Sequence, residues 1–307
     1  MGVLDRVPAP LCGVSLGLAG LAGIVGPFHP LVAFVPAVAA ALLLVLFVVR
    51  CMVIHGSLNK DLSRPVSACI LGTFPMSMMI LTQYIADFHA VATVFLAVGI
   101  VMQVSLMVHI TVRILPGMRL DDIHACIFVP YVGIAAGGIT APALGYYGVA
   151  AACDLVAVAL ALPLMVAVAY RYARAPTVAN PEKPLFCIAA APFAICSVAL
   201  GMYPELAPVW SRAVLYVIAL AAFVLVAARL PSLHRLPFMP SYASMTFPMC
   251  ISASATRVVS EMVGGLVSDV LFVTFIIQAL VAAFLVLYVL ALFLVYLTGR
   301  KPRTLFS

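Results

Sequence analysis

Two ionisable residues stand close together within a long apolar stretch, where a charge is costly unless it is paired or used. Arg257 and Glu261 are four positions apart, so on a helix they share one face at ion-pair distance. Asp154, within another apolar stretch, is a further candidate partner. Because charges in such surroundings commonly mark function, these residues form either a structural ion pair or part of a site that attracts an ion.

Residue patterns typical of enzymes and metal sites are missing from the sequence. Gly13-Val-Ser15-Leu-Gly17 has the G-x-S-x-G spacing of a hydrolase nucleophile, but that motif requires a strand-to-helix turn, and here it stands in an apolar helical stretch. The 8 cysteines show no C-x-x-C spacing, and the 6 histidines form no H-E-x-x-H motif. We therefore expect no enzyme activity, no catalytic residues, no metal and no cofactor.

A tetrapeptide with phenylalanine and proline occurs twice. Thr73-Phe74-Pro75-Met76 recurs as Thr246-Phe247-Pro248-Met249, and Pro130 and Pro192 lie between them, so that successive prolines are 55, 62 and 56 residues apart. A proline inside a helix removes one backbone hydrogen bond and kinks the helix. Four such kinks at similar spacing predict an internal repeat whose helices face a common interior.

The elements that position these residues must be membrane helices. Hydrophobic residues make up 66% of the 307 residues, and only 8% are charged, whereas a soluble domain carries about 25% charged residues. The mean hydropathy is +1.24. Apolar stretches of roughly 20 residues predict a single transmembrane domain over residues 1–307 with ten spans: 9–27, 31–49, 66–86, 90–112, 123–144, 149–170, 185–203, 209–228, 238–260 and 268–298.

Basic residues are divided unequally between the connectors. Of the 16 Lys and Arg, only Arg212 and Arg257 fall on the side that the odd-numbered spans reach, which leaves 16 − 2 = 14 on the other side. Since basic residues are retained in the cytoplasm, we expect a multi-pass protein of the plasma or inner membrane with both termini cytoplasmic. Topology then explains the net charge of +6, and no nucleic-acid partner is expected.

The motifs occur in the order typical of one family of membrane transporters. Residues 240–249 resemble the ninth helix of the tellurite-resistance/dicarboxylate transporter family, which includes bacterial tellurite-resistance proteins, fungal malate permeases and plant slow-type anion channels. The first, third, fifth and seventh helices of that family resemble, in turn, residues 7–18, 64–66, 128–133 and 183–192.

This resemblance implies an all-α fold of five helical hairpins around a central pore, with odd helices inside and even helices outside. It also implies a homotrimer in which each protomer has its own pore. A phenylalanine on helix nine occludes the pore, and the matching residue here is Phe247. Phe74 precedes the equivalent proline of the repeat and is expected as a second gate residue. The residues expected to shape the pore are Pro75, Pro130, Pro192 and Pro248.

No ring of charges lines the odd spans, so selectivity must come from pore width, hydroxyl groups and dipoles. Candidate lining residues are small or hydroxylated: Ser15, Thr73, Ser77, Gly133, Gly137, Thr246 and Ser252. Such a pore suits chloride, nitrate or a small carboxylate. Alternatives are a proton-coupled C4-dicarboxylate carrier, an efflux protein for tellurite or another toxic compound and, less favoured, a non-transporting receptor. Arg257, Glu261 and Asp154 would lie near the outer surface, as a structural ion pair or an outer vestibule.

Overall fold

The protein is helical throughout the part of the chain that the computed structural model describes, residues 2–203, 208–233, 235–302 and 304. Helices account for 83% of the structure, and the described residues form no strand. This confirms the predicted all-α class.

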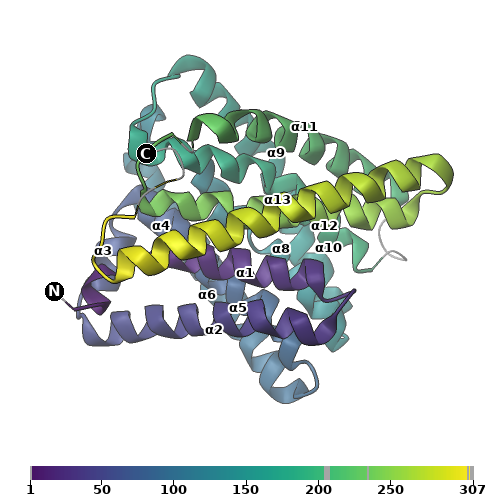
Figure 1. Cartoon of the computed structure of the whole chain (residues 1–307), viewed down its shortest axis with the longest axis horizontal. Coiled ribbons are helices and arrows are strands. Elements are labelled where there is room, and N and C mark those ends of the chain that lie inside the picture. The colour runs from purple at the N-terminus through teal and green to yellow at the C-terminus, as the bar shows by residue number, and fades with distance from the viewer. Residues whose placement is uncertain (1, 204–207, 234, 303, 305–307) are drawn as a thin grey trace.

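The chain alternates between continuous and interrupted helical segments (Figure 1). After the 15-residue helix α1 (Leu11–Val25), the continuous helices are α2 (Pro30–Val53), α6 (His89–His109), α9 (Tyr147–Arg174), α11 (Val209–Leu233) and α13 (Gly265–Leu297). The interrupted segments combine α4 (Pro65–Leu71), α5 (Thr73–Leu81) and η2 (Thr82–Ile85); η6 (Ala125–Ile127), α7 (Phe128–Val132), α8 (Ala135–Thr140) and η7 (Ala141–Leu144); η8 (Asn180–Ala190) and α10 (Pro192–Gly201); and η9 (Pro240–Met245) and α12 (Phe247–Met262). Shorter elements are η1 (Leu4–Arg6), α3 (Ser57–Leu62), η3 (Ile110–Ile114), η4 (Leu115–Gly117) and η5 (Leu120–Asp122).

The interrupted segments lie inside and the continuous helices outside. In the most apolar window of Pro65–Ile85 and of Asn180–Gly201, 67% and 83% of residues are buried. The corresponding shares for α2, α9, α11 and α13 are 33%, 28%, 28% and 39%. Since an outer helix must present most of its surface to lipid, this difference confirms the arrangement of odd segments inside and even helices outside.

By length and composition, seven helices of the described chain can cross a membrane, or up to eight if the pair Ala125–Val132 and Ala135–Leu144, bent by 49°, counts as one span. The number ten is therefore not confirmed. The two shortfalls are α1, with 15 residues, and α12, with 16 residues, which continues the 3₁₀ turn η9.

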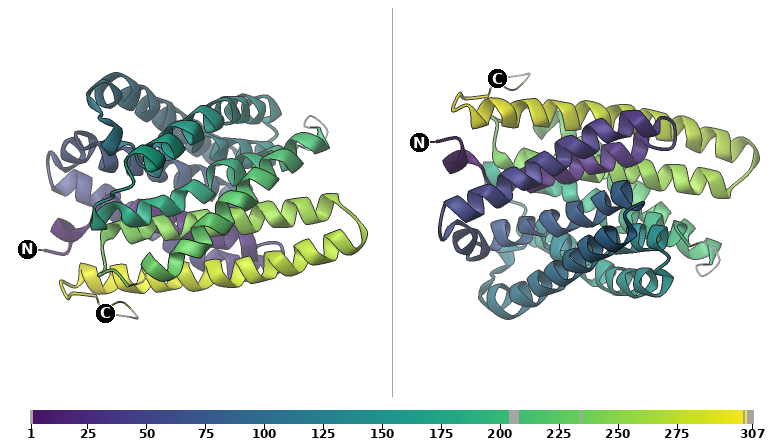
Figure 2. Two further views of the ribbon diagram at one scale, coloured as in Figure 1. Left: turned by 90° about the horizontal axis from the view of Figure 1, so that it is seen from above. Right: turned by 90° about the horizontal axis from the view of Figure 1, so that it is seen from below.

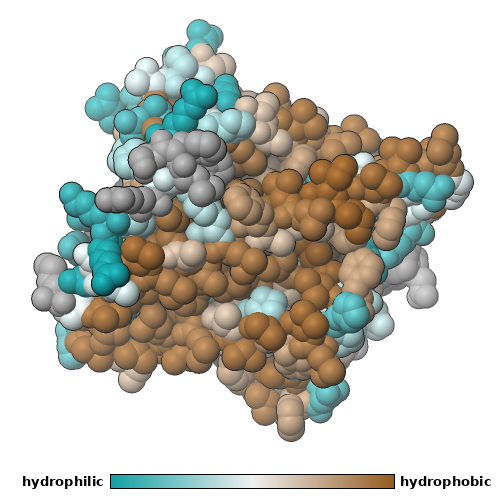
Figure 3. All heavy atoms as spheres, in the orientation of Figure 1, coloured by the Kyte–Doolittle hydropathy of each residue, from teal (hydrophilic) through white to brown (hydrophobic). Residues whose placement is uncertain are grey.

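The outer surface suits a lipid bilayer. A broad apolar area runs across the face shown in Figure 3, and hydrophilic residues gather near the end that holds the termini and along the opposite edge. Both termini lie at the same end of the molecule in the two views of Figure 2. We call this the terminal end, and the other the distal end.

The four inner prolines stand at the starts of α-helices rather than within them. Pro192 and Pro248 occupy the first and second residues of α10 and α12, and Pro75 and Pro130 the third residues of α5 and α7. The first amides of a helix have no intrahelical acceptor, so a proline there removes no hydrogen bond. The predicted mid-helix kinks are thus junctions between two shorter helical pieces.

Candidate functional site

Two cavities lie between the inner segments. The first, in the half nearer the terminal end, has a free volume of about 60 Å³ and is lined from all five inner segments, for example by Leu16, Met76, Val132, Ile195 and Phe247. The second, towards the distal end, has about 280 Å³ and is lined in the same way, for example by Gly20, Ile80, Ile139, Val198 and Ile251. The two cavities thus lie one after the other between the terminal and distal ends.

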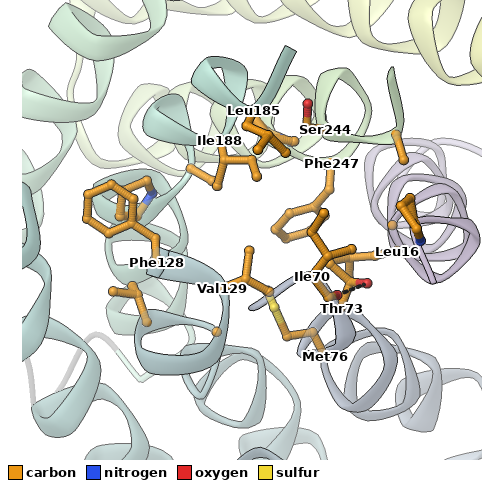
Figure 4. Close-up of a pocket in the computed structure, with 18 of the residues that line it drawn as sticks. Leu16, Ile70, Thr73, Met76, Phe128, Val129, Leu185, Ile188, Ser244 and Phe247 are labelled. Carbon is orange, nitrogen blue, oxygen red and sulfur yellow. Dashed lines mark hydrogen bonds between the residues drawn. The ribbon is translucent and has the colours of Figure 1, made fainter. Parts of the chain in front are cut away.

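Phe247 lines both cavities, and among the described lining residues it is the one that they share. Its side chain is 5% exposed. In Figure 4 the ring points into the space between Ile70 and Ile188, with Val129 beside it. The residue predicted as a pore gate therefore stands where the two cavities meet.

Glycines of α1 allow the junction of η9 and α12 to come close enough to hold this ring. A Cβ added at Gly17 would lie 2.4 Å from the Cβ of Thr246, and one added at Gly20 would lie 3.2 Å from Cδ2 of Phe247 and 2.9 Å from the Cβ of Cys250. The Thr246 hydroxyl donates towards the carbonyl of Gly13, 3.1 Å away. Larger residues on α1 would displace the segment that positions Phe247.

Phe74 lies elsewhere, although it occupies the same place in the repeated tetrapeptide. Its ring packs against Phe47 of α2, with the centroids 5.9 Å apart, and it lines grooves between α2, α5 and α6 rather than the first cavity. On α5, Thr73 and Met76 face the first cavity instead. The structure thus gives no support to Phe74 as a second gate residue.

The helices that precede the two tetrapeptides differ in type and in length. Residues 240–245 form the 3₁₀ helix η9, whereas residues 65–71 form the α-helix α4. A 3₁₀ helix turns about 120° per residue and an α-helix about 100°. Over the six residues of η9 the excess reaches about 120°, close to the rotation of one residue. The distance from the entry proline also differs, at nine residues from Pro65 to Phe74 and seven from Pro240 to Phe247. Phe247 faces the first cavity, and Phe74 faces away from it.

The other residues predicted to line or to shape the pore fall into two groups. Thr73, Gly133, Pro192 and Pro248 line the first cavity. The remainder are used in packing between helices. Ser15 and Ser77 share a 2.8 Å hydrogen bond between α1 and α5, with both side chains fully buried.

The remaining residues of the second group also contact neighbouring residues and do not line the first cavity. Ser252 donates to the carbonyl of Pro248 in its own helix at 2.8 Å and reaches the carbonyl of Ala190 in η8 at 3.4 Å. A Cβ added at Gly137 would lie 3.1 Å from Sγ of Cys153 on α9. Pro75 borders the groove that contains Phe74, and Pro130 is buried in α7. Sequence alone could not separate lining from packing, because a hydroxyl or a glycine serves both purposes.

Arg257 and Glu261 are paired in the structure, with 2.9 Å between Nε and Oε1. Both residues line the second cavity. Asp154 joins neither of them: it is buried on α9, accepts a hydrogen bond from the hydroxyl of Tyr203 and lies close to Gly138 of α8. The three residues therefore form two separate sites, and only the Arg257–Glu261 pair borders a cavity.

Gln103 is a buried polar residue that our sequence reasoning missed. It lies on the outer helix α6, is fully buried, and its amide donates to the carbonyls of Val129 (2.8 Å) and Pro130 (2.9 Å). These carbonyls precede the bend between α7 and α8, and that of Val129 also accepts a hydrogen bond from the Gly133 amide at 3.2 Å. Buried carbonyls in a membrane need such a donor. In the sequence, Gln103 is a single polar side chain within a long apolar stretch, and this pattern could have indicated its buried hydrogen-bonding role.

A small cluster of polar groups closes the terminal end of the fifth segment. That segment begins at Ala125, so His124 lies in the connector before it. Its Nε2 is 3.2 Å from Oε2 of Glu182, and its side chain is 2% exposed. Burial lowers the pKa of His124; the Glu182 carboxylate opposes this shift, and the Arg171 guanidinium adds to it.

The first cavity offers few polar groups for chemistry. Its hydroxyls belong to Thr73, Ser241 and Ser244, and the Thr73 and Ser244 hydroxyls donate to backbone carbonyls of their own segments at 2.7 Å. In the described part of the chain, no group of three or more His, Cys, Asp and Glu residues could hold a metal ion. A narrow apolar constriction of this kind suits controlled passage of small solutes.

Two comparisons bear on this geometry. A family model described as voltage-dependent anion channel (SLAC1) matches residues 6–298, nearly the whole chain. A comparison with curated proteins gives no match.

Proposed function

Because this chain belongs to the voltage-dependent anion channel family, we propose that it conducts small anions along the path between its inner segments and that Phe247 closes this path. The protein is a multi-pass membrane protein, and its family supports an anion channel or transporter. The observation that carries the proposal is the position of Phe247, which borders both cavities.

An apolar ring can close such a path without a chemical latch. Water and ions avoid a narrow apolar constriction, so a single phenyl group stops conduction when no fixed charge lies beside it. Among the described residues that line the first cavity, none is charged. Selectivity there depends on width and on weak polar contacts, which favours small anions such as chloride or nitrate, or a small carboxylate.

Orientation and assembly belong to the same proposal. We assign the terminal end to the cytoplasm because the sequence pattern puts only Arg212 and Arg257 of the 16 basic residues on the other side. Basic residues at that end would also raise the local concentration of anions. Three protomers, each with its own path, are expected to assemble as a trimer.

Current recordings in planar bilayers test the function. The purified protein and its Phe247→Ala variant are reconstituted under a potassium chloride gradient. We expect the variant to carry a current whose reversal potential follows chloride. A current that follows potassium would contradict anion conduction. Proton-coupled uptake in proteoliposomes without current would favour the carrier alternative.

A further inference from the structure

The second cavity is lined by the side chain of Arg257, whose ion-pair partner Glu261 uses only one of its N–H donors. We propose that Arg257 binds the transported anion in this cavity and that Glu261 is an internal counter-ion, which the entering anion displaces. This inference rests on the proposed function, since it concerns the same path. It assigns the second cavity a binding step that precedes or follows passage of Phe247.

The position of Arg257 places it on the path. Arg257 and Phe247 belong to the same helix, α12, ten residues apart, which corresponds to about 15 Å along the axis. Both line the second cavity, and the charged residues among its described lining are Arg257 and Glu261. An anion that crosses this cavity to or from Phe247 therefore passes the guanidinium.

The guanidinium retains free donors for such an anion. Arginine has five N–H donors, and one of them, at Nε, donates to Glu261. The Nη atoms have no hydrogen-bond partner among the described residues, and the side chain is 24% exposed. The Cζ atom of Arg257 lies over the Phe28 ring, 5.1 Å from its centroid. This cation–π contact stabilises the guanidinium without using any of its N–H donors.

Glu261 is poorly suited to a purely structural pair. Its side chain is 60% exposed, and it meets Arg257 through a single contact at 2.9 Å. An exposed i, i+4 pair contributes little to stability, so the carboxylate can leave Arg257 at little cost. A chloride or carboxylate that arrives in the cavity can take its place by the same chemistry.

Anion binding is tested first without current. Thermal unfolding of the purified protein is measured in chloride and in gluconate, a larger anion, at equal ionic strength. Binding to the folded state raises the Tm. We expect Glu261→Gln to lower the half-saturating chloride concentration about threefold to tenfold, because chloride no longer competes with a carboxylate. Arg257→Gln should abolish the chloride effect, and Arg257→Lys should keep part of it.

The matched control is Asp269→Asn, which removes the same charge as Glu261→Gln at an exposed site of the same end that does not line the cavity. It should leave the chloride effect unchanged. If Asp269→Asn and Glu261→Gln act alike, the effect is one of net charge and the proposed displacement is wrong.

The same substitutions are then combined with Phe247→Ala in bilayers. Arg257→Gln should raise the half-saturating chloride concentration for current entering from the distal side about threefold to tenfold, with the difference fading at 1 M salt, where the screening length is about 3 Å. If Phe247→Ala conducts chloride and Arg257→Gln changes neither this concentration nor the Tm response, the inference fails and the proposed function stands. If chloride binding requires Arg257 but Phe247→Ala carries no current, the binding site stands and the proposed gate fails.

Discussion

Replacing Phe247 by alanine removes the ring that borders both cavities while leaving Pro248, and with it the junction between η9 and α12, in place. Truncating a fully packed core phenylalanine costs about 3–5 kcal/mol. Here the ring already borders free volumes of about 60 and 280 Å³, so fewer packing contacts are lost. We therefore expect a loss of about 2–3 kcal/mol, and the variant should still fold.

We expect Phe247→Ala to change the anion current more strongly than it changes the stability of the fold. An anion that squeezes past an apolar ring loses at least one hydrogen bond to water, at a cost of about 3 kcal/mol. Restoring that water by opening the constriction lowers the barrier by the same amount, which corresponds to about a hundredfold in rate. We expect Phe247→Ala to raise the chloride current by about this factor.

The chain offers a matched control for this variant. Phe74 precedes the equivalent proline of the repeated tetrapeptide but packs against Phe47, away from the first cavity. Phe74→Ala should lower the Tm without raising the current. If both variants conduct, loosening of the inner segments explains the effect. If a well-folded Phe247→Ala conducts no better than the parent protein, the ring does not close the path.

Three further expectations concern stability, pH and topology. Gln103→Leu removes the amide donor of the buried Pro130 carbonyl and one of the two donors of the Val129 carbonyl, and should cost about 1–3 kcal/mol, seen as a lower Tm than in Met102→Leu, a change at its exposed neighbour. Because burial lowers the pKa of His124 in the folded protein, the unfolded chain binds more protons just below its ordinary pKa of about 6.5; stability should therefore fall as pH drops through that window, and His124→Gln should flatten the pH dependence of Tm. A cysteine at exposed Asp87 should react with an impermeant maleimide in intact cells, and one at exposed Asn59 should not. The native cysteines are buried or partly buried. Labelling at Asn59 would contradict the predicted cytoplasmic position of the termini.

Local chemistry made part of this structure predictable. Apolar stretches led to the all-α class, and proline spacing to helices around a common interior, because lipid exposure and helix junctions depend on residues near in sequence. The pairing of Arg257 with Glu261 followed from their separation on one helix. Each of these features is fixed within one or two turns. The inner position of the odd segments came from the family resemblance.

Features that depend on rotation or on distant partners were not predictable. The tetrapeptide around Phe74 matches that around Phe247, but the two rings face different ways, and the turns that precede them differ in type and number. Gln103 and the carbonyl of Val129 meet from different segments. Ser15 and Ser77 were equally plausible as pore hydroxyls until the contact between α1 and α5 placed them against each other.

The placement of the inner prolines has a mechanical consequence. The prolines lie within the first three residues of α5, α7, α10 and α12. Four of the five inner segments therefore consist of shorter helices joined end to end. A proline joint has no amide hydrogen to break, so tilting one helix against the next disturbs few backbone bonds. Residues at these junctions, including Thr73, Phe128, Pro192 and Pro248, line the first cavity together with Phe247, so a small tilt at a junction would change the width of the path at that level.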